Sequence, residues 1–424
     1  MDLVTSAQYL TMKDSFTREG INIEVAYRPA GDVHHIHAAG RLLAVDREAN
    51  IQRLQEALPG LRLADSDEQP QIDGSELVVL SLDDVEGGHL TVAEALDLID
   101  ERLGDGNPAL DGGEPLVTPV HVMHIAKICP AGEPEVPSGY PAQPWPAPVP
   151  AGNSRRDVRL GVCDTGFLEN LDRTRYPWLA NVDGETDPLG PMLPGNRQSI
   201  PQYAGHGTFA AGVASSMAPG ASVYVNNHFT KSGGELEHVI IAKLEQLIRD
   251  QAPDVVNLSA GTYTRNGWAS LGFSDFRRRH PEITLVAAAG NDGTDRKFYP
   301  AAFSWVVAVG ALGADQRNRA WFSNHGDWVD VYALGEGLVN AYATGVYAYH
   351  EPPKRPAKQD FHGMARWDGT SFSTPLVAGL IAAEMAKSGA AAPEAAQRVL
   401  EAARQQAVPG VGPVLYPPQD GPAA

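Results

Sequence analysis

Four polar residues stand where their side chains could act together on an amide bond. Asp164 ends the apolar run "VRLGVC", and His206 stands between two glycines in "GHGTFAAG". Asn291 ends the run "ITLVAAAG", and Ser371 lies in "GTSFSTPLVAG". A serine that attacks an amide needs a base for its proton, a carboxylate to hold that base, and donors for the oxyanion. These residue types together predict amide hydrolysis.

Each of these residues also has a purely structural explanation. Ser371 fits a helix cap, His206 a packed core histidine, Asp164 a turn and Asn291 the end of a strand. Pro375 is tolerated in a first helical turn, so Ser371 is expected near a helix start, where unpaired N–H groups favour an anion. The joint occurrence of all four favours the chemical interpretation.

The four motifs resemble those of the subtilisin-like serine proteases, the subtilase family. The matching segments are "VCDTG", "GHGTFAAG", "AAAGNDG" and "GTSFSTPLVAG", in the family's order, within residues 155–410. The resemblance implies that Ser371 attacks the scissile carbonyl and that His206 acts as base and then as acid. It further implies that Asp164 orients the imidazole and that Asn291 stabilises the oxyanion.

The resemblance also implies a substrate-binding edge, because the family segment that matches "NLSAGTY" pairs with extended substrate backbone. The residues assigned to substrate binding are Ser259, Ala260, Gly261, Gly290 and Phe298. Phe298 stands at the floor of the primary specificity pocket, where many members carry a small or polar residue. A ring that points into the pocket would favour small residues before the cut, whereas a ring turned into the core would not.

No metal or other cofactor is assigned from the sequence. Many family members carry a second histidine where Phe209 stands, followed by a longer loop that often helps to bind calcium. That loop is missing here, so a structural calcium ion has no assignable ligands. The acidic segment "DGETD" (183–187) is expected to be a solvated loop. In "HHIH", only His35 and His37 share a strand face, which predicts surface or packed histidines rather than a metal site.

A parallel sheet is needed to bring the four distant residues together. Apolar runs such as "DVVNLSAG" and "WVVAVGAL" alternate with helical patterns such as "TPLVAGLIAAEMAKSG". This alternation predicts an α/β fold, a parallel sheet with helices on both faces as in subtilisin. Ligands of such sheets bind beyond the carboxyl ends of the strands, where Asp164 is expected.

A smaller α+β domain is expected over residues 30–128. Its patterns follow the order βαββαβ, which is typical of a ferredoxin-like fold. A capped helix is expected in "DREANIQRLQEALPG", and a second helix in "TVAEALDLIDERLGDG" with Thr91 as its cap. The domain is either a pro-domain that assists folding and blocks the cleft, as subtilases commonly have, or a permanent adaptor for a partner.

The remaining segments are assigned by composition. Residues 129–154 are rich in proline and predict an extended linker, in which processing of a pro-domain is expected. Candidate positions for that processing are Tyr140, Trp145, Ala142, Ala147 and Ala151. Residues 1–29 are assigned to an N-terminal extension and 411–424 to a C-terminal tail. The stretch 336–366 predicts an insertion that either shapes substrate access or decorates the surface.

The composition limits the class of protein further. Acidic residues outnumber basic ones by 52 to 33, a net charge of -19, which argues against a nucleic acid or an anionic membrane as partner. The first residues lack the pattern of a signal peptide, and the two cysteines form no disulfide framework, so a cytoplasmic location is expected.

The leading functional hypothesis is an intracellular serine endopeptidase with a restricted peptide or protein target. The alternative is a catalytically silent protein that keeps the same fold to hold peptides.

Overall fold

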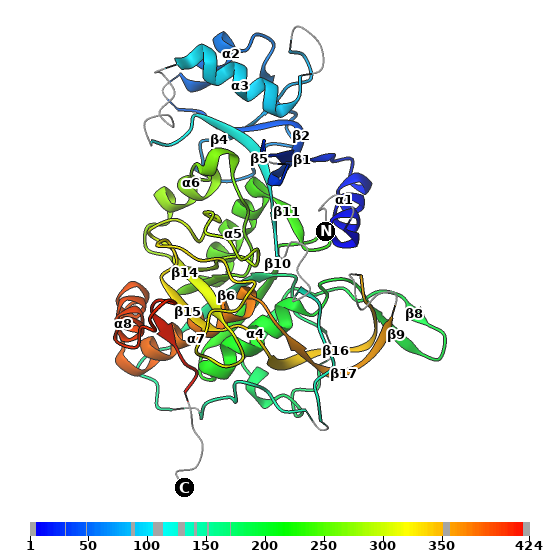
Figure 1. Ribbon diagram of the computed structural model, residues 1–424, viewed down its shortest axis with the longest axis vertical. Helices are drawn as coiled ribbons and strands as arrows, with labels where there is room; N and C mark the ends of the chain where they lie inside the picture. The colour runs from blue at the N-terminus through cyan, green and yellow to red at the C-terminus, as the bar shows by residue number, and fades with distance from the viewer. Residues whose placement is uncertain are drawn as a thin grey trace.

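The computed structural model describes residues 6–29, 31–47, 49–85, 90–104, 113–125, 132–139, 142–150, 152–169, 171–350 and 357–418. They form two units along the long axis of the molecule, the smaller at the top of Figure 1.

The larger unit is built on an eight-stranded sheet in the order β18-β15-β14-β13-β12-β6-β10-β7. All of its neighbouring strands pair in parallel. Its strands are β6 (Arg159–Asp164), β7 (Val182–Gly184), β10 (Ser222–Asn227), β12 (Val255–Leu258), β13 (Thr284–Ala288), β14 (Val307–Leu312), β15 (Val331–Leu334) and β18 (Val414–Leu415). The central strands are buried on both faces, which explains their near-continuous apolar sequences. The expected α/β fold is confirmed.

Helices cover both faces of this sheet. They are α4 (His206–Met217), α5 (Glu237–Gln251), α6 (Leu271–Arg279), α7 (Thr370–Ser388) and α8 (Ala392–Gln405), with short 3-10 turns η5 (Pro177–Leu179) and η6 (Arg265–Gly267). Val255 packs into the core formed with α4, α7 and α8, whereas the next residue, Val256, packs into the core formed with α5 and α6. Residues 414–415, assigned to the tail, instead join the sheet as β18 beside β15.

The smaller unit has the topology expected from its sequence. Strands β2 (Val33–Val45), β3 (Arg62–Leu63), β4 (Leu77–Ser81) and β5 (Val117–His124) lie antiparallel in the order β5-β2-β4-β3. Helices α2 (Asn50–Ala57) and α3 (Val92–Leu103) share a core with one face of this sheet. The other face packs toward α5 and α6 of the larger unit.

The two helix starts of this unit differ. Thr91 and Glu94 form a reciprocal capping box at α3, so the expected cap is present. The expected cap of α2 is absent, because Ala49 precedes the helix in a left-handed conformation and has no side chain that can cap it.

Residues assigned to the N-terminal extension take part in the fold. Helix α1 (Ala7–Arg18) is followed by β1 (Ile23–Tyr27), which pairs antiparallel with β2. The helix packs closely on the larger unit, since a Cβ atom added at Gly234 would lie 2.6 Å from the Met12 sulfur.

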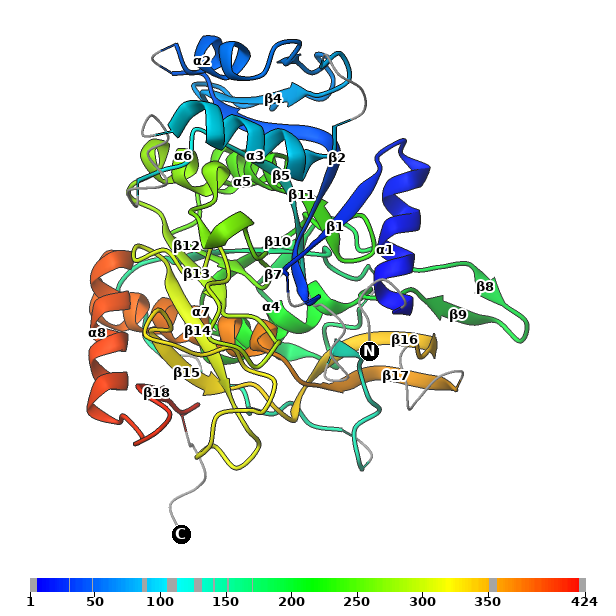
Figure 2. The same cartoon turned by 45° about the horizontal axis from the view of Figure 1, so that its top comes forward.

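The two units share a sheet as well as a core. Strand β5 runs from the upper sheet toward the larger unit (Figure 1), where it pairs antiparallel with β11 (Gly234–Leu236). Figure 2 shows the same arrangement from another side.

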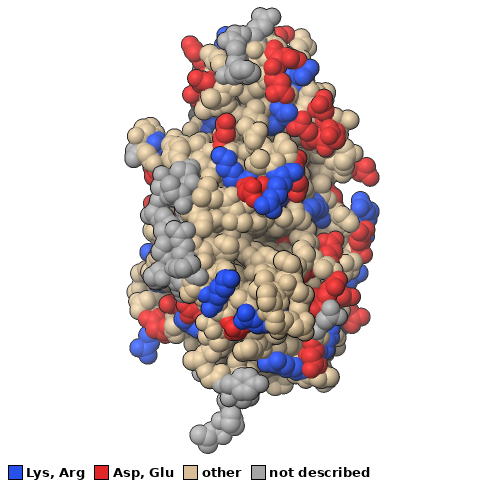
Figure 3. Space-filling view, turned by 90° about the vertical axis from the view of Figure 1, so that its right-hand side faces the viewer, with Lys and Arg blue, Asp and Glu red and all other residues tan. Residues whose placement is uncertain are grey.

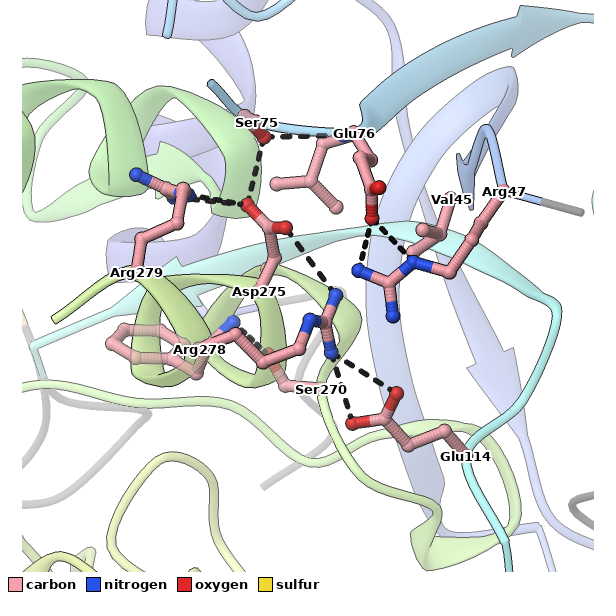
Figure 4. A network of polar contacts seen from close by, with 12 residues as sticks. Val45, Arg47, Ser75, Glu76, Glu114, Ser270, Asp275, Arg278 and Arg279 are labelled. Carbon is pink, nitrogen blue, oxygen red and sulfur yellow. Dashed lines mark hydrogen bonds and ion pairs between the residues drawn. The ribbon is translucent and has the colours of Figure 1, made fainter. Parts of the chain in front are cut away.

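A polar network also joins α6 to the smaller unit (Figure 4). Asp275 accepts hydrogen bonds from Ser75 Oγ at 2.7 Å and from Arg279 Nε at 2.9 Å. Arg278 forms an ion pair with Glu114 at 3.1 Å. Asp275 is buried, whereas Arg278 and Glu114 are partly exposed, so the ion pair between these two contributes modestly.

A second small sheet projects from the larger unit (Figures 1 and 2). Its strands β8 (Met192–Leu193), β9 (Arg197–Ile200), β16 (Leu338–Ala348) and β17 (Lys358–Trp367) lie in the order β17-β16-β9-β8. The expected insertion at 336–366 thus forms the β16–β17 hairpin.

Charged side chains are spread unevenly over the surface. On the face in Figure 3, acidic groups gather on the upper unit and along the right-hand edge. Among the described residues, none of the helices has the length and apolar character that crossing a bilayer requires.

Candidate active site

The main sheet and its helices bring the four predicted residues to one edge. Asp164 is the last residue of β6, and Asn291 follows shortly after β13. His206 begins α4, and Ser371 lies in the first turn of α7. Strand ends and helix starts therefore meet at the carboxyl edge, where ligands of parallel sheets bind.

Asp164 holds the imidazole of His206. The His206 Nδ1 atom lies 2.7 Å from Asp164 Oδ1, which also accepts from the Thr165 amide at 2.8 Å. The Asp164 side chain is fully buried. With Nδ1–H directed to the carboxylate, Nε2 is the nitrogen that can accept a proton.

Aromatic rings fix the plane of this imidazole. The ring centroid of His206 lies 4.9 Å from that of Phe372 and 5.2 Å from that of Trp367. Phe209, which replaces the family's second histidine, packs behind them at 4.6 Å from Phe372. The ring is therefore held by packing as well as by Asp164.

Ser371 is held at the start of α7 by contacts with Ser259. Ser259 Oγ donates to the Ser371 carbonyl at 2.8 Å, and Ser371 Oγ donates to the Ser259 carbonyl at 3.3 Å. The Ser371 hydroxyl does not hydrogen-bond His206 in this arrangement. Nucleophile–base bonds are often long in the absence of substrate, so this geometry alone does not exclude the pair.

Asn291 is oriented as an oxyanion donor by its neighbour. Its Oδ1 atom accepts from the backbone N of Thr370 at 2.9 Å and from Thr370 Oγ1 at 2.8 Å. The Thr370 hydroxyl also receives the Gly290 amide at 3.2 Å. Because Oδ1 is engaged in this way, the Asn291 amide nitrogen is left to donate toward a developing oxyanion.

Phe298 lies against the backbone that lines the predicted specificity pocket. A Cβ atom added at Gly261 would lie 2.4 Å from its ring, and one added at Gly290 would lie 3.2 Å from it. The ring is buried, with 3% of its surface exposed. The ring therefore fills the space beside both glycines.

The substrate-binding edge predicted at 259–261 is occupied by the chain itself. His124 donates its amide to the Gly261 carbonyl at 3.0 Å, and Gly261 donates back at 3.1 Å. Ile125 donates to the Gly233 carbonyl at 2.9 Å. The end of β5 thus lies between two backbone edges as an added strand, the manner in which an extended peptide is bound.

Asp187 is a site residue that the sequence did not reveal, and the expected solvated loop at 183–187 is wrong for it. Its Oδ2 atom accepts from Thr165 Oγ1 at 2.8 Å and from the Gly205 amide at 2.6 Å, next to the Asp–His pair. Burial raises the pKa of Asp187 to about 7. Its partners stand 18 and 22 residues away, so no local motif could have indicated them.

The described residues contain no group of histidine, cysteine, aspartate or glutamate side chains suited to a metal ion. Within "HHIH", His35 and His37 are buried against each other, and His35 also packs with His121.

Comparisons with known proteins agree with this geometry. Residues 155–412 match the model described as the Subtilase family. The chain is 32% identical over 253 residues to the "Thermophilic serine proteinase" of Bacillus sp. (strain AK1), which covers 55% of this chain and 53% of that protein. It is 28% identical over 249 residues to the "Intracellular serine protease" of Paenibacillus polymyxa, which covers 54% of this chain and 66% of that protein. The matched region thus spans between about half and two thirds of these relatives.

One solved structure is similar over nearly the whole chain. Fervidolysin from Fervidobacterium pennivorans, described as a keratinolytic enzyme related to subtilisin, aligns with a TM-score of 0.55 and 18% identity. The alignment covers 90% of this chain and 60% of that structure, and it supports the fold.

Proposed function

Because the chain belongs to the subtilase family, we propose that it is a serine endopeptidase that uses Asp164, His206 and Ser371, with Asn291 as an oxyanion donor. The observation that carries this proposal is the 2.7 Å bond between His206 and buried Asp164, beside a serine at a helix start.

The chemistry follows from these positions. Ser371 Oγ attacks the scissile carbonyl carbon while His206 Nε2 takes its proton, and Asp164 stabilises the imidazolium. The Asn291 amide and the Ser371 backbone N–H stabilise the oxyanion. His206 then gives the proton to the leaving amine, and water hydrolyses the acyl-enzyme by the same steps in reverse order.

We further propose that the smaller unit is a pro-domain and that the uncut chain is latent. This is supported by the end of β5, which fills the edge at Gly261. The bond to be cut then lies after Ile125 and before Gly132, upstream of the positions expected from sequence. Trp145 pairs with Val339 on the β16–β17 hairpin instead, and Ala142 packs on the core there. Tyr140 and Ala151 lie outside the described residues.

The substrate class proposed is an extended or unfolded segment with a small residue before the cut. Backbone pairing at Gly261 requires an extended chain, and the ring of Phe298 leaves little room for large side chains. An intracellular location with a restricted target is also proposed. The likeness to a relative named as intracellular supports the location.

The test uses three forms of the full chain. Intact-mass spectrometry and labelling with a serine-reactive phosphonate are compared for the parent, Ser371→Ala and Ser373→Ala, a buried serine two residues away. We expect the parent and Ser373→Ala to be cut within residues 125–132 and labelled, and Ser371→Ala to stay whole and unlabelled. A parent that is cut by another protease within this segment and still takes no label would favour the peptide-binding alternative.

A further inference from the structure

Two proline-rich stretches, residues 132–139 and 142–149, contact the base of the β16–β17 hairpin from both sides. Glu135 and Arg366 exchange two backbone hydrogen bonds, at 2.8 and 2.7 Å. Trp145 and Val339 exchange another two, at 2.8 and 2.9 Å. Val339 of β16 and Arg366 of β17 are paired with each other in the hairpin. Trp145 therefore pairs with the outer edge of β16, and Glu135 pairs with the outer edge of β17 opposite it.

Side chains reinforce these contacts. The carboxylate of Glu133, 3% exposed, accepts from the amide of His350 at 2.7 Å and from the Tyr347 hydroxyl at 3.2 Å. Glu135 forms an ion pair with Arg366 at 2.8 Å. A buried carboxylate is costly without such donors, so Glu133 is a specific anchor.

These contacts connect the segment to His206 by two routes, one through β17 and one through α4. Arg366 is followed in β17 by Trp367, whose ring packs against His206 at 5.2 Å. Val149 donates its amide to the Ser216 carbonyl at 2.8 Å, and Ser216 lies in α4, the helix that begins with His206. The segment therefore contacts both elements that hold the base.

We propose that residues 132–139 and 142–149 form a permanent strap of the peptidase, which stays in place after the N-terminal unit is separated and positions His206 through Trp367. The segment lies outside the region matched by the family model, which begins at 155. The strap rests on the proposed function, since it acts on the base of that same triad. Glu133, Glu135 and Arg366 are positioning residues.

The test removes strap contacts in the full chain, since Glu135→Pro loses both a backbone hydrogen bond and the ion pair to Arg366. Glu135→Pro eliminates the amide that bonds to Arg366, whereas Val136→Pro, the control, changes an exposed neighbour whose amide bonds nothing in the described residues. Glu133→Gln, of equal size, is the second variant. Activity is measured as release of the aniline group from a peptide anilide. The rate is divided by the concentration of active sites, which is determined by titration with the phosphonate.

We expect Glu135→Pro and Glu133→Gln to lower kcat about tenfold with KM unchanged, because a small displacement of the base costs rate rather than binding. In the processed parent, the amides of Glu135, Trp145 and Val149 should remain protected from hydrogen exchange.

The outcomes separate the two proposals. A parent that is neither labelled nor active contradicts the proposed function. If the parent and Val136→Pro are active, an unchanged kcat in both strap variants, or a change in KM alone, would overturn the strap, and so would rapid exchange of the three amides after processing.

Discussion

At the scale of single residues, we propose that Phe298 limits the size of the substrate side chain that fits beside the edge at Gly261. Its ring lies against Gly261 and Gly290, two positions without side chains, so backbone and ring together close the space. A steric wall of this kind discriminates by overlap.

Replacing the ring should therefore change specificity. Phe298→Gly is expected to raise kcat/KM for a peptide with Phe before the scissile bond, relative to one with Ala, by about tenfold or more. Paired anilide substrates measure the ratio, and Phe303→Ala, on the same segment, serves as the control. A parent enzyme that already prefers Phe would contradict the role given to Phe298.

Asp187 gives the site a second buried carboxyl group. Because burial raises its pKa from 3.8 to about 7, the folded protein keeps a proton between these values that the unfolded chain has lost. Its contribution to the free energy of unfolding is thus full below about pH 4 and is lost as pH rises through 7.

The loss should be visible in thermal unfolding. In a Ser371→Ala background, which prevents self-digestion, Asp187→Asn is expected to reduce the fall in Tm between pH 5 and pH 8. Asp183→Asn, an exposed change in the nearby strand β7, should leave that fall as it is. An equal fall in Tm for the Asp187 variant and its parent would show that Asp187 does not titrate in this range.

At the scale of elements, four histidines meet where β2 and β5 face the peptidase. The ring of His35 lies 4.9 Å from His34, 5.3 Å from His37 and 5.4 Å from His121. His121 in turn bonds the buried carboxylate of Glu237 at 3.0 Å. Burial lowers the pKa of His35 and His37, and nearby histidines lower that of His35 further.

This cluster should make docking of the smaller unit sensitive to acid. Since the docked state binds fewer protons, its stabilisation is present above about pH 6.5 and falls by about 1.4 kcal/mol for each pH unit below that value. In Ser371→Ala, protection of the His124 and Ile125 amides, corrected for intrinsic exchange, should fall about thirtyfold more between pH 7.5 and 5 than in a chain that also carries His35→Leu. The exposed His362→Leu is the control, and equal losses would exclude His35 as the cause.

Local signals explain which elements could be predicted. Thr91 and Glu94 are three residues apart and form the cap that their spacing predicts, whereas α2 lacks its cap because Ala49 takes the position before it. Strand β11 has three residues, too few for a pattern, and it exists only because β5 lies beside it. The motifs around Asp164 and His206 could be recognised, but Asp187 depends on contacts between distant segments.

At the scale of the whole molecule, the two units are joined by a common core. Met123 of β5, Leu236 of β11 and Leu244 of α5 belong to one buried cluster, and Met12 and Phe16 of α1 extend it. The domain boundary in the sequence therefore does not coincide with a boundary in packing.

Strand β5 has a consequence for the fate of the smaller unit once it is separated. All eight residues of β5 are buried in the whole chain, between β2 on one side and β11 on the other. Release would leave the end of this strand, Val122–His124, without its partners β11 and Gly261, as an unpaired edge and a template for pairing with other chains. The freed fragment is therefore expected to aggregate or be degraded unless it returns to a peptidase, which would make activation difficult to reverse.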